Sequence, residues 1–274
     1  MAVTTSSFDG IWFPTDIVQR IMNEALDGTP LFDNVTRQRT SRATVSFPTA
    51  DPTGFDWRGE YGEIPTVSPG DGSAVYAPAK IAGIIEMTNE AIADADGDPV
   101  GALTMAIRDS MVAKAERDCL YAPDVPNAAA PDPVVPALGS PVGGANLRES
   151  VIDALAEMYG AGGQPNVLFT SADLFAEELK RRESLAGAIP GAGDPFGDLG
   201  VKTVVVPNLD PEDAILADSR RVYAVWRGDP TIEVSDSAAW SRDSVSFRIK
   251  ARLVLAIPVP TKAARLLYVG GGGS

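Results

Sequence analysis

Two clusters of acidic side chains are the residues of this sequence best suited to do chemistry. Paired carboxylates can serve as general acid and base, and carboxylate oxygens can bind calcium. The clusters comprise Asp94, Asp96 and Asp98, and Asp210, Glu212 and Asp213. They fall at predicted helix starts and turns, where Asp is favoured as a capping and turn residue, and neither has the spacing of an EF-hand. The sequence therefore favours a structural role and predicts no catalytic residue, metal site or cofactor.

Other chemistries are excluded by the residue types themselves. The 274 residues include no His and a single Cys, so they offer no Ser-His-Asp triad, histidine metal site or internal disulfide. Cys119 falls on a predicted helix and is expected to be a small buried apolar residue. The glycine-rich tract at 187–200 lacks the Gly-Lys-Ser/Thr ending of a phosphate-binding loop, and a predicted strand follows it. We therefore expect a protein that is not an enzyme.

The charge is acidic overall and uneven along the chain. Against 37 Asp and Glu stand 23 Lys and Arg, and the net charge of −14 argues against a surface that binds nucleic acid throughout. Residues 231–269 nevertheless carry six basic residues against three acidic ones, which leaves −17 over the rest. Arg248, Lys250 and Arg252 alternate with apolar residues and so share one face of a predicted strand. They either meet an acidic partner or pair with this chain's own carboxylates across strands, and the sequence favours the second.

Residues 42–79 form the least regular segment of the sequence. After an alternating pattern at 43–47, five Pro and five Gly interrupt the segment, which predicts an extended loop. The loop carries the aromatic residues Phe55, Trp57, Tyr61 and Tyr76. Disordered segments are poor in aromatic residues, and long loops of compact domains are usually functional. We expect these side chains to order against another surface, and a mobile surface insertion is the alternative.

The rest of the chain predicts an α+β protein. Apolar residues at helical spacing predict helices over 16–26, 99–121, 146–159 and 170–182. Shorter apolar runs predict strands, and period-two alternation predicts a long strand over 244–257 with one buried and one basic face. The shorter strands are expected near 80–87, 167–169, 201–206, 215–217, 222–226, 231–234 and 264–269. We expect no signal peptide, because the N-terminus MAVTTSSFDG has neither a basic nor an apolar region, and no membrane span, because no apolar run reaches about 20 residues.

The order of these elements resembles the Hong Kong 97-type major capsid proteins of tailed bacteriophages. The resemblance covers roughly residues 10–269 and is carried by two tracts, AKIAGIIEMTNEAIAD at 79–94 and VSFRIKAR followed by a turn at 245–264. It implies an N-terminal arm over 1–41, the extended loop over 42–79 and a peripheral subdomain over 80–145 with a spine helix at 99–121. It further implies an axial subdomain over 146–225, peripheral return strands over 226–269 and a flexible tail over 270–274.

The resemblance also implies a function. Such proteins assemble as pentamers and hexamers into an icosahedral shell around double-stranded DNA, inside the host cytoplasm, and become the virion capsid. The loop residues Phe55, Trp57, Arg58, Tyr61 and Tyr76 would then contact a neighbouring copy. The basic strand face would lie on an inner or intersubunit surface, and packaged DNA would be met only indirectly. The further partners implied are a portal and a separate scaffolding or decoration protein, and no membrane is involved.

Two departures from the family pattern and several alternatives remain. Some relatives cross-link their subunits through a Lys on the extended loop, whereas 42–79 contains no Lys, so we expect a non-covalent shell. Because the loop begins by residue 42, we expect any scaffolding function to reside in a separate protein. The main alternative is an encapsulin-type nanocompartment shell that encloses a cargo enzyme. A tail or adaptor component and a hydrolase with an acidic pocket are less favoured.

Overall fold

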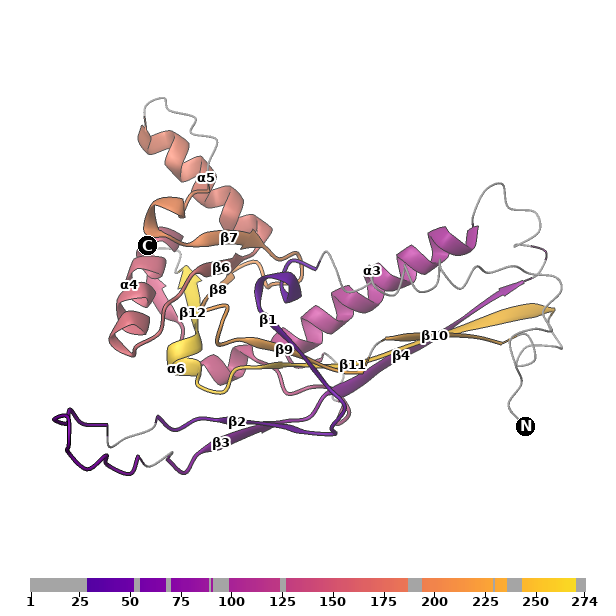
Figure 1. The fold of residues 1–274 in the computed structure, drawn as a ribbon. Helices are drawn as coiled ribbons and strands as arrows, with labels where there is room; N and C mark the ends of the chain where they lie inside the picture. Colours follow the sequence, from indigo (N-terminus) through magenta and orange to yellow (C-terminus); the bar gives the residue numbers. More distant parts are fainter. Residues whose placement is uncertain are drawn as a thin grey trace.

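Two β-sheets and a projecting hairpin organise the molecule (Figure 1). The computed structural model describes residues 29–51, 55–67, 70–88, 90, 99–123, 127–186, 194–228, 230–235 and 243–269. The predicted helix over 16–26, the first acidic cluster, the first half of the glycine-rich tract (187–193) and the tail at 270–274 lie outside these residues. Within the described part, no helix is long and apolar enough to cross a membrane.

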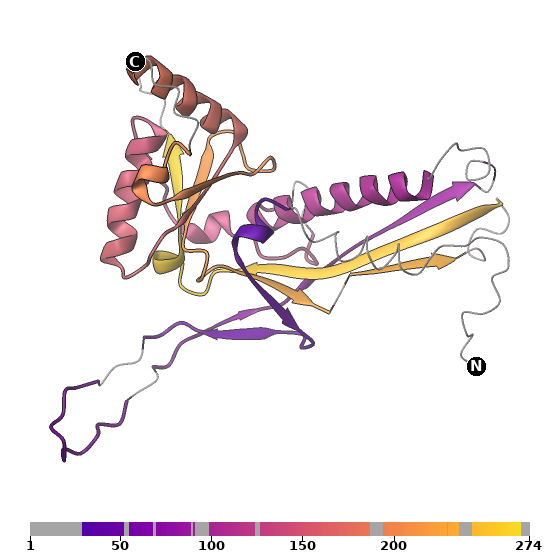
Figure 2. The ribbon, with the colours of Figure 1, turned by 45° about the horizontal axis from the view of Figure 1, so that its top comes forward.

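The first sheet is built around one long strand, β11 (Ser244–Ala256). On one side β11 pairs antiparallel with β4 (Ala79–Thr88), and on the other with β10 (Thr231–Ser235) and β9 (Tyr223–Arg227). The strand β1 (Thr36–Thr40) then joins β9 in parallel. The helix α3 (Pro99–Leu120) runs along this sheet (Figure 2), and its buried residues Ala115, Cys119 and Leu120 share one core with Ala251 and Leu253 of β11.

The second sheet has the strand order β5-β12-β8-β6-β7. Its strands are β5 (Val142–Gly144), β6 (Val167–Thr170), β7 (Lys202–Val205), β8 (Asp213–Ala217) and β12 (Ala264–Val269). The helices α4 (Leu147–Gly160) and α5 (Ala172–Ala186) flank it, and the short helix α6 (Pro260–Ala263) leads into β12. Three 3-10 turns complete the described chain: η1 (Phe32–Asn34), η2 (Val135–Leu138) and η3 (Gly197–Leu199).

Local sequence signals account for the helix starts. The side chain of Asn146 accepts a hydrogen bond from the amide of Glu149 at 3.0 Å, and the Glu149 carboxylate accepts one from the amide of Ala145 at 3.1 Å. This reciprocal arrangement satisfies amides at the start of α4 that have no partner inside the helix. Ser171 begins α5 in the same way, because its hydroxyl accepts from the amide of Leu174 at 3.3 Å.

A buried carboxylate connects the start of the described chain to α3. Glu116 is 1% exposed, and it accepts hydrogen bonds from the amide of Leu31 at 3.2 Å and from the Asn208 side chain at 2.8 Å. Burial raises the pKa of the Glu116 carboxyl above its ordinary value. One side chain thus connects three segments that are far apart in sequence.

Most predicted elements are found, with differences that have physical causes. The predicted helix at 99–121 is α3, the strand at 244–257 is β11, and α5 extends four residues beyond the predicted end at 182. The strands β1 and β5 were not predicted, because one is polar and the other is a short Gly-containing segment. The grouping of 226–269 with the peripheral strands needs correction, since β12 pairs with β8 and β5 in the second sheet. The strand β1 was assigned to the arm, and residues 223–225 of β9 were assigned to the axial segment 146–225. Both strands belong to the first sheet.

Candidate functional site: an extended loop and a basic sheet face

The segment 42–79 is a two-stranded hairpin with a long extended end. The strand β2 (Val45–Pro48) pairs antiparallel with β3 (Ser73–Tyr76), and the amide of Thr49 continues the ladder to the carbonyl of Gly72 at 3.0 Å. Gly70 has a φ of +75°, a conformation that favours Gly, and a Cβ there would lie 2.5 Å from that of Ala50. Figure 2 shows the hairpin projecting away from the rest of the molecule.

The root of this loop is packed against the first sheet. Phe47 stacks on Tyr223 with ring centroids 4.7 Å apart and meets Tyr76 edge-on at 6.0 Å. Phe47 also shares a small core with Val225 of β9 and Val254 of β11. Asp51 forms an ion pair with Lys262 of α6, and this pair lowers the pKa of the Asp51 carboxyl. The root is therefore fixed within the subunit.

The tip of the loop has the opposite character. Phe55, Trp57, Tyr61 and Ile64 are 77%, 99%, 98% and 86% exposed. Burial of a large apolar side chain such as each of these contributes about 1.5–3 kcal/mol. A concentration of uncovered apolar side chains on a projecting segment is typical of an interaction site.

The five predicted contact residues separate into two groups. Phe55, Trp57, Arg58 and Tyr61 lie together near the exposed tip, and the Arg58 guanidinium pairs with Asp56 at 3.1 Å. Tyr76 instead lies half-buried at the root against Phe47, and burial raises the pKa of its phenol. The sequence did not indicate this division, because spacing along a loop does not show which residues pack back onto the protein.

The basic face of β11 is also divided. Arg248 and Lys250 both form ion pairs with Glu233, which the antiparallel register of β10 places opposite Arg248. For these two residues, the interpretation that the chain's own carboxylates pair with them is confirmed. Arg252 lies beyond the paired end of β10, faces Lys80 across the β4 ladder, and has no ion pair within the residues that the structure describes.

Replacing Glu233 by Gln is expected to lower the thermal unfolding temperature slightly near neutral pH and to have no effect at low pH. Lys250 and Arg248 hold the pKa of Glu233 at about 2, below the ordinary 4.5, so their stabilisation is present above pH 4.5 and is lost as pH falls towards 2. The effect is small because the pair is exposed. Thermal unfolding across this pH range tests it, with Glu212→Gln, at an exposed residue, as control. A difference that persists at pH 2 would contradict the pairing.

The acidic cluster at 210–213 has a structural role. The Arg117 guanidinium pairs with Asp210 at 2.6 Å and lies 4.2 Å from the centre of the Tyr121 ring. The Tyr121 hydroxyl donates to Asp213 at 2.6 Å and accepts from the amide of Asp210 at 3.0 Å, and burial raises its pKa. These bonds fasten the end of α3 to the loop before β8. No group of three potential metal ligands occurs among the described residues.

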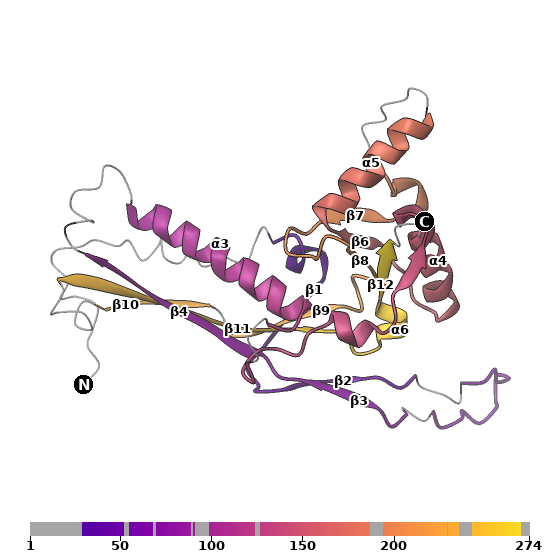
Figure 3. The ribbon, with the colours of Figure 1, turned by 180° about the vertical axis from the view of Figure 1, so that it is seen from behind.

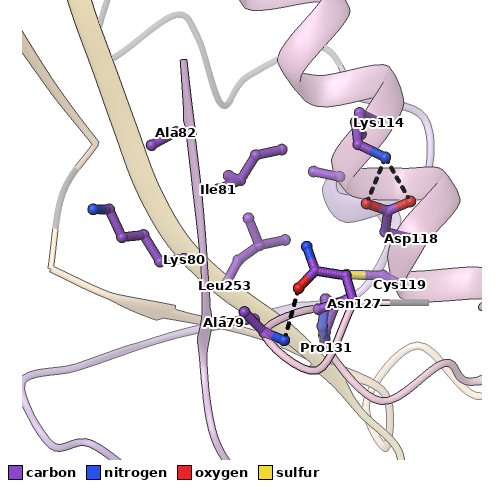
Figure 4. A pocket seen from close by; sticks show the side chains of 13 residues that line it. Ala79, Lys80, Ile81, Ala82, Lys114, Asp118, Cys119, Asn127, Pro131 and Leu253 are labelled. Carbon is purple, nitrogen blue, oxygen red and sulfur yellow. Dashed lines mark hydrogen bonds and ion pairs between the residues drawn. The ribbon is translucent and has the colours of Figure 1, made fainter. Parts of the chain in front are cut away.

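A small cavity of about 190 Å³ lies between α3, β4 and the segment 127–131 (Figure 4). Polar side chains of its lining already have partners within the protein, since Lys114 pairs with Asp118 at 2.9 Å and Asn127 accepts a hydrogen bond from the amide of Ala129 at 3.0 Å. Cys119 also lines it, but burial raises the pKa of this thiol to about 12, so the thiolate nucleophile is not available. Lys114 and Asp118 are paired with each other and the Cys119 thiol stays protonated, so the lining gives no indication of a reaction centre.

Comparisons with known proteins give a consistent result. The model of a phage capsid protein family matches residues 71–266. A solved structure from Mycobacterium phage Cain is similar in fold, with a TM-score of 0.69 at 20% identity over 88% of this chain and 90% of that chain. The capsid of a native GTA particle has a TM-score of 0.62 at 14% identity, over 98% of this chain and 94% of that chain. A virus-like particle from Pyrococcus furiosus has a TM-score of 0.61 at 13% identity, over 92% of this chain and 98% of that chain. No curated protein sequence matches.

Proposed function

Because this chain belongs to the phage capsid protein family, we propose that it assembles as pentamers and hexamers into an icosahedral shell that encloses the double-stranded DNA of a tailed bacteriophage. Membership of the family makes it a structural protein of the virion, and the α+β class and Hong Kong 97-type fold predicted from the sequence are confirmed. The pentamers, the hexamers and the enclosed DNA are the proposal.

The observation that supports this function best is the projecting loop with an uncovered aromatic tip. Trp57 and Tyr61 are almost fully exposed on the extended loop, whose root is fixed at Phe47. In the isolated subunit this apolar surface contacts water. In a shell, the extended loop can lie over a neighbouring copy, where burial of these rings contributes to a contact repeated around every capsomer.

We assign subdomain roles from the two sheets. The first sheet with α3 would form the peripheral subdomain, and the second sheet with α4 and α5 the axial subdomain, which lies nearest the centre of each capsomer. The first sheet and the loop then provide lateral contacts between copies, whereas the second sheet provides contacts around the capsomer axis. This assignment includes β12 in the axial subdomain, as its pairing with β8 requires.

The charge of the chain supports an indirect relation to DNA. A subunit of net charge −14 repels phosphate on most of its surface, and two of the three basic residues of β11 are already paired with Glu233. A portal, a scaffolding protein and a decoration protein are further proposed partners. Assembly would take place in the cytoplasm of the bacterial host.

A nanocompartment shell of the encapsulin type is the second candidate function. The similarity in fold to the virus-like particle from Pyrococcus furiosus supports this second candidate. The two functions differ in what the shell contains, nucleic acid in one case and a folded cargo protein in the other.

Expression of the chain with its genomic neighbours, followed by sedimentation and negative-stain electron microscopy, tests the proposed function. Closed icosahedral shells that contain nuclease-protected DNA are the expected result. Shells filled with a cargo protein would favour the nanocompartment, and monomers, rings or tubes would contradict both functions.

The mature particles are expected to be held together without covalent cross-links. The loop segment 42–79 contains no Lys that could form an isopeptide bond with a neighbouring copy. Boiled particles should therefore give a single band at the monomer position on a denaturing gel. A ladder of higher bands would show covalent joining through another residue, and Lys80 at the root of the loop would be the first residue to replace.

A further inference from the structure

We propose that the outer edge of β4 pairs antiparallel with the same edge of a second copy, about a two-fold axis that passes through Gly83. The two copies then share one continuous sheet. This inference deepens the proposed function and depends on it, because it names one of the lateral contacts through which copies of this chain would join. It concerns the strand edge of the first sheet and does not involve the extended loop.

The strand β4 has a long edge that no described strand covers. It pairs with β11 on one side over all ten residues of Ala79–Thr88, and no strand of the described chain pairs with its other side. Figure 2 shows β4 as the outermost strand, with β11 between it and β10. Strands of about 5–6 residues are the commonest. A sheet edge of this length offers a row of amide and carbonyl groups to which another strand can pair.

The middle of this edge is open. Ala82, Gly83 and Ile84 are exposed, and Ile84 has 66% of its surface uncovered. A Cβ atom built on Gly83 would meet no atom within 4 Å. The ladder to β11 is continuous and β4 contains no Pro, so neither a bulge nor a Pro protects the edge. Figures 1 and 3 show the hairpin and the C-terminal end of β4 extending towards opposite ends of the molecule, so the hairpin does not cover it.

The sequence of β4 is self-complementary about Gly83. In an antiparallel pair centred on this residue, positions equally far before and after it lie opposite each other. Lys80 therefore faces Glu86 of the second copy, and this pair occurs twice in each contact. Ile81 likewise faces Ile85 of the second copy. A register shift of one residue in either direction would place an apolar residue opposite Lys80 and turn the strand over.

The pairing also supplies an anion to cations that lack one. Arg252 of β11 lies directly opposite Lys80, and like charges in this arrangement are destabilising. No ion pair to either residue occurs among those that the structure describes, although Arg248 of the same strand has one. In the shared sheet, Glu86 of the second copy extends the row that contains Arg252 and Lys80. The contact thus joins opposite charges where a single copy places like charges together.

The symmetry of this contact suits a closed shell. Figure 4 shows Lys80 on the side of β4 away from α3, while Ile81 points towards the helix. Lys80 and Glu86 lie on the same face of β4, because side chains alternate along a strand. The register therefore places α3 of both copies on the same side of the shared sheet, and the two-fold axis is perpendicular to that sheet. In a shell wall that contains the first sheet, copies related in this way present the same side outwards.

The variant Gly83→Cys tests the register directly. The axis brings residue 83 of both copies together with Cα atoms about 4.5–5.5 Å apart, within reach of a disulfide. Oxidation of assembled particles is expected to convert most of the chain to a dimer band on a non-reducing denaturing gel. Thr88→Cys, at an exposed position of the same strand, is the matched control. Its two copies would lie roughly 30 Å apart, so it should stay monomeric, as should the wild type, whose Cys119 is buried.

Charge reversal tests the ion pairs separately. Lys80→Glu and Glu86→Lys are each expected to lower shell yield by roughly tenfold, because each contact then contains two pairs of like charges. The double variant Lys80→Glu/Glu86→Lys restores opposite charges in both pairs and is expected to recover shells. Lys180→Glu, which reverses an exposed charge on α5, is the control. Circular dichroism checks that every variant folds.

The outcomes separate the inference from the function. A dimer band from Gly83→Cys and recovery in the double variant support the pairing. Shells of Gly83→Cys that stay monomeric on oxidation overturn it while leaving the shell function intact, since another strand would then cover the edge. A double variant that folds but does not recover also overturns it, and this series decides alone if Gly83→Cys forms no shells. A wild-type chain that forms no particles contradicts the proposed function itself, and the inference with it.

Discussion

Replacing Trp57 and Tyr61 together by Ser is expected to abolish shell formation while leaving the subunit folded. Both rings are almost fully exposed in the single subunit, so their removal costs the fold little. In the shell the burial of each ring would contribute about 1.5–3 kcal/mol, in a contact that recurs in every copy. Sedimentation of the expressed protein should show slowly sedimenting subunits or capsomers in place of particles.

Two comparisons make this prediction specific. The conservative variant Trp57→Phe/Tyr61→Phe keeps an aromatic ring at both positions and is expected to assemble. Thermal unfolding of the unassembled Ser variant should match that of the unassembled wild-type subunit. Particles of the Ser variant at wild-type yield would mean that the loop tip is not an assembly contact, and the choice of the loop as the functional site would be wrong.

Replacing Phe32 by Ala is expected to destabilise the subunit by about 3–5 kcal/mol. Phe32 is 1% exposed and packs edge-on against Trp226 of β9, with ring centroids 5.7 Å apart and an interplanar angle of 77°. Its removal leaves a cavity between η1 and the first sheet, at the point where β1 joins that sheet. Denaturant unfolding of the unassembled subunit measures the loss.

The control for this core variant is Phe32→Leu, which keeps most of the volume and is expected to cost less than about 1.5 kcal/mol. An Ala variant that unfolds at the wild-type denaturant concentration would show that η1 is detached in solution. The packing of η1 and β1 on the first sheet would then be incorrect. This result would leave the role of the loop tip unaffected, because the two sites lie at different places in the fold.

The elements that the sequence predicted well are those whose pattern is local. The alternation of Val245, Phe247 and Ile249 with polar residues identifies β11, since one face of that strand packs on α3 and the other is partly exposed. Asn146 and Glu149 identify the start of α4 because their side chains bond to nearby amides. The exposed aromatic loop was predicted for a similar reason, because Pro and Gly exclude regular structure and aromatic residues are rare in disordered segments.

The features that the sequence could not predict depend on long-range pairing. The strand β1, with the sequence TRQRT, has no apolar face, and it forms a strand because β9, 187 residues later in the chain, offers backbone partners from Tyr223 to Arg227. The place of β12 in the second sheet depends on its pairing with β8 in the same way. The partner of Arg248 and Lys250 became evident only when the register placed Glu233 beside them.

An electron cryomicroscopy reconstruction of the assembled particle tests the central claim most directly. The account predicts a closed icosahedral shell of pentamers and hexamers in which the loop of each copy lies on a neighbouring copy, with Trp57 and Tyr61 buried in the contact. A particle in which these rings remain exposed to solvent, or a protein that remains monomeric under all conditions in which its genomic neighbours are present, would contradict it.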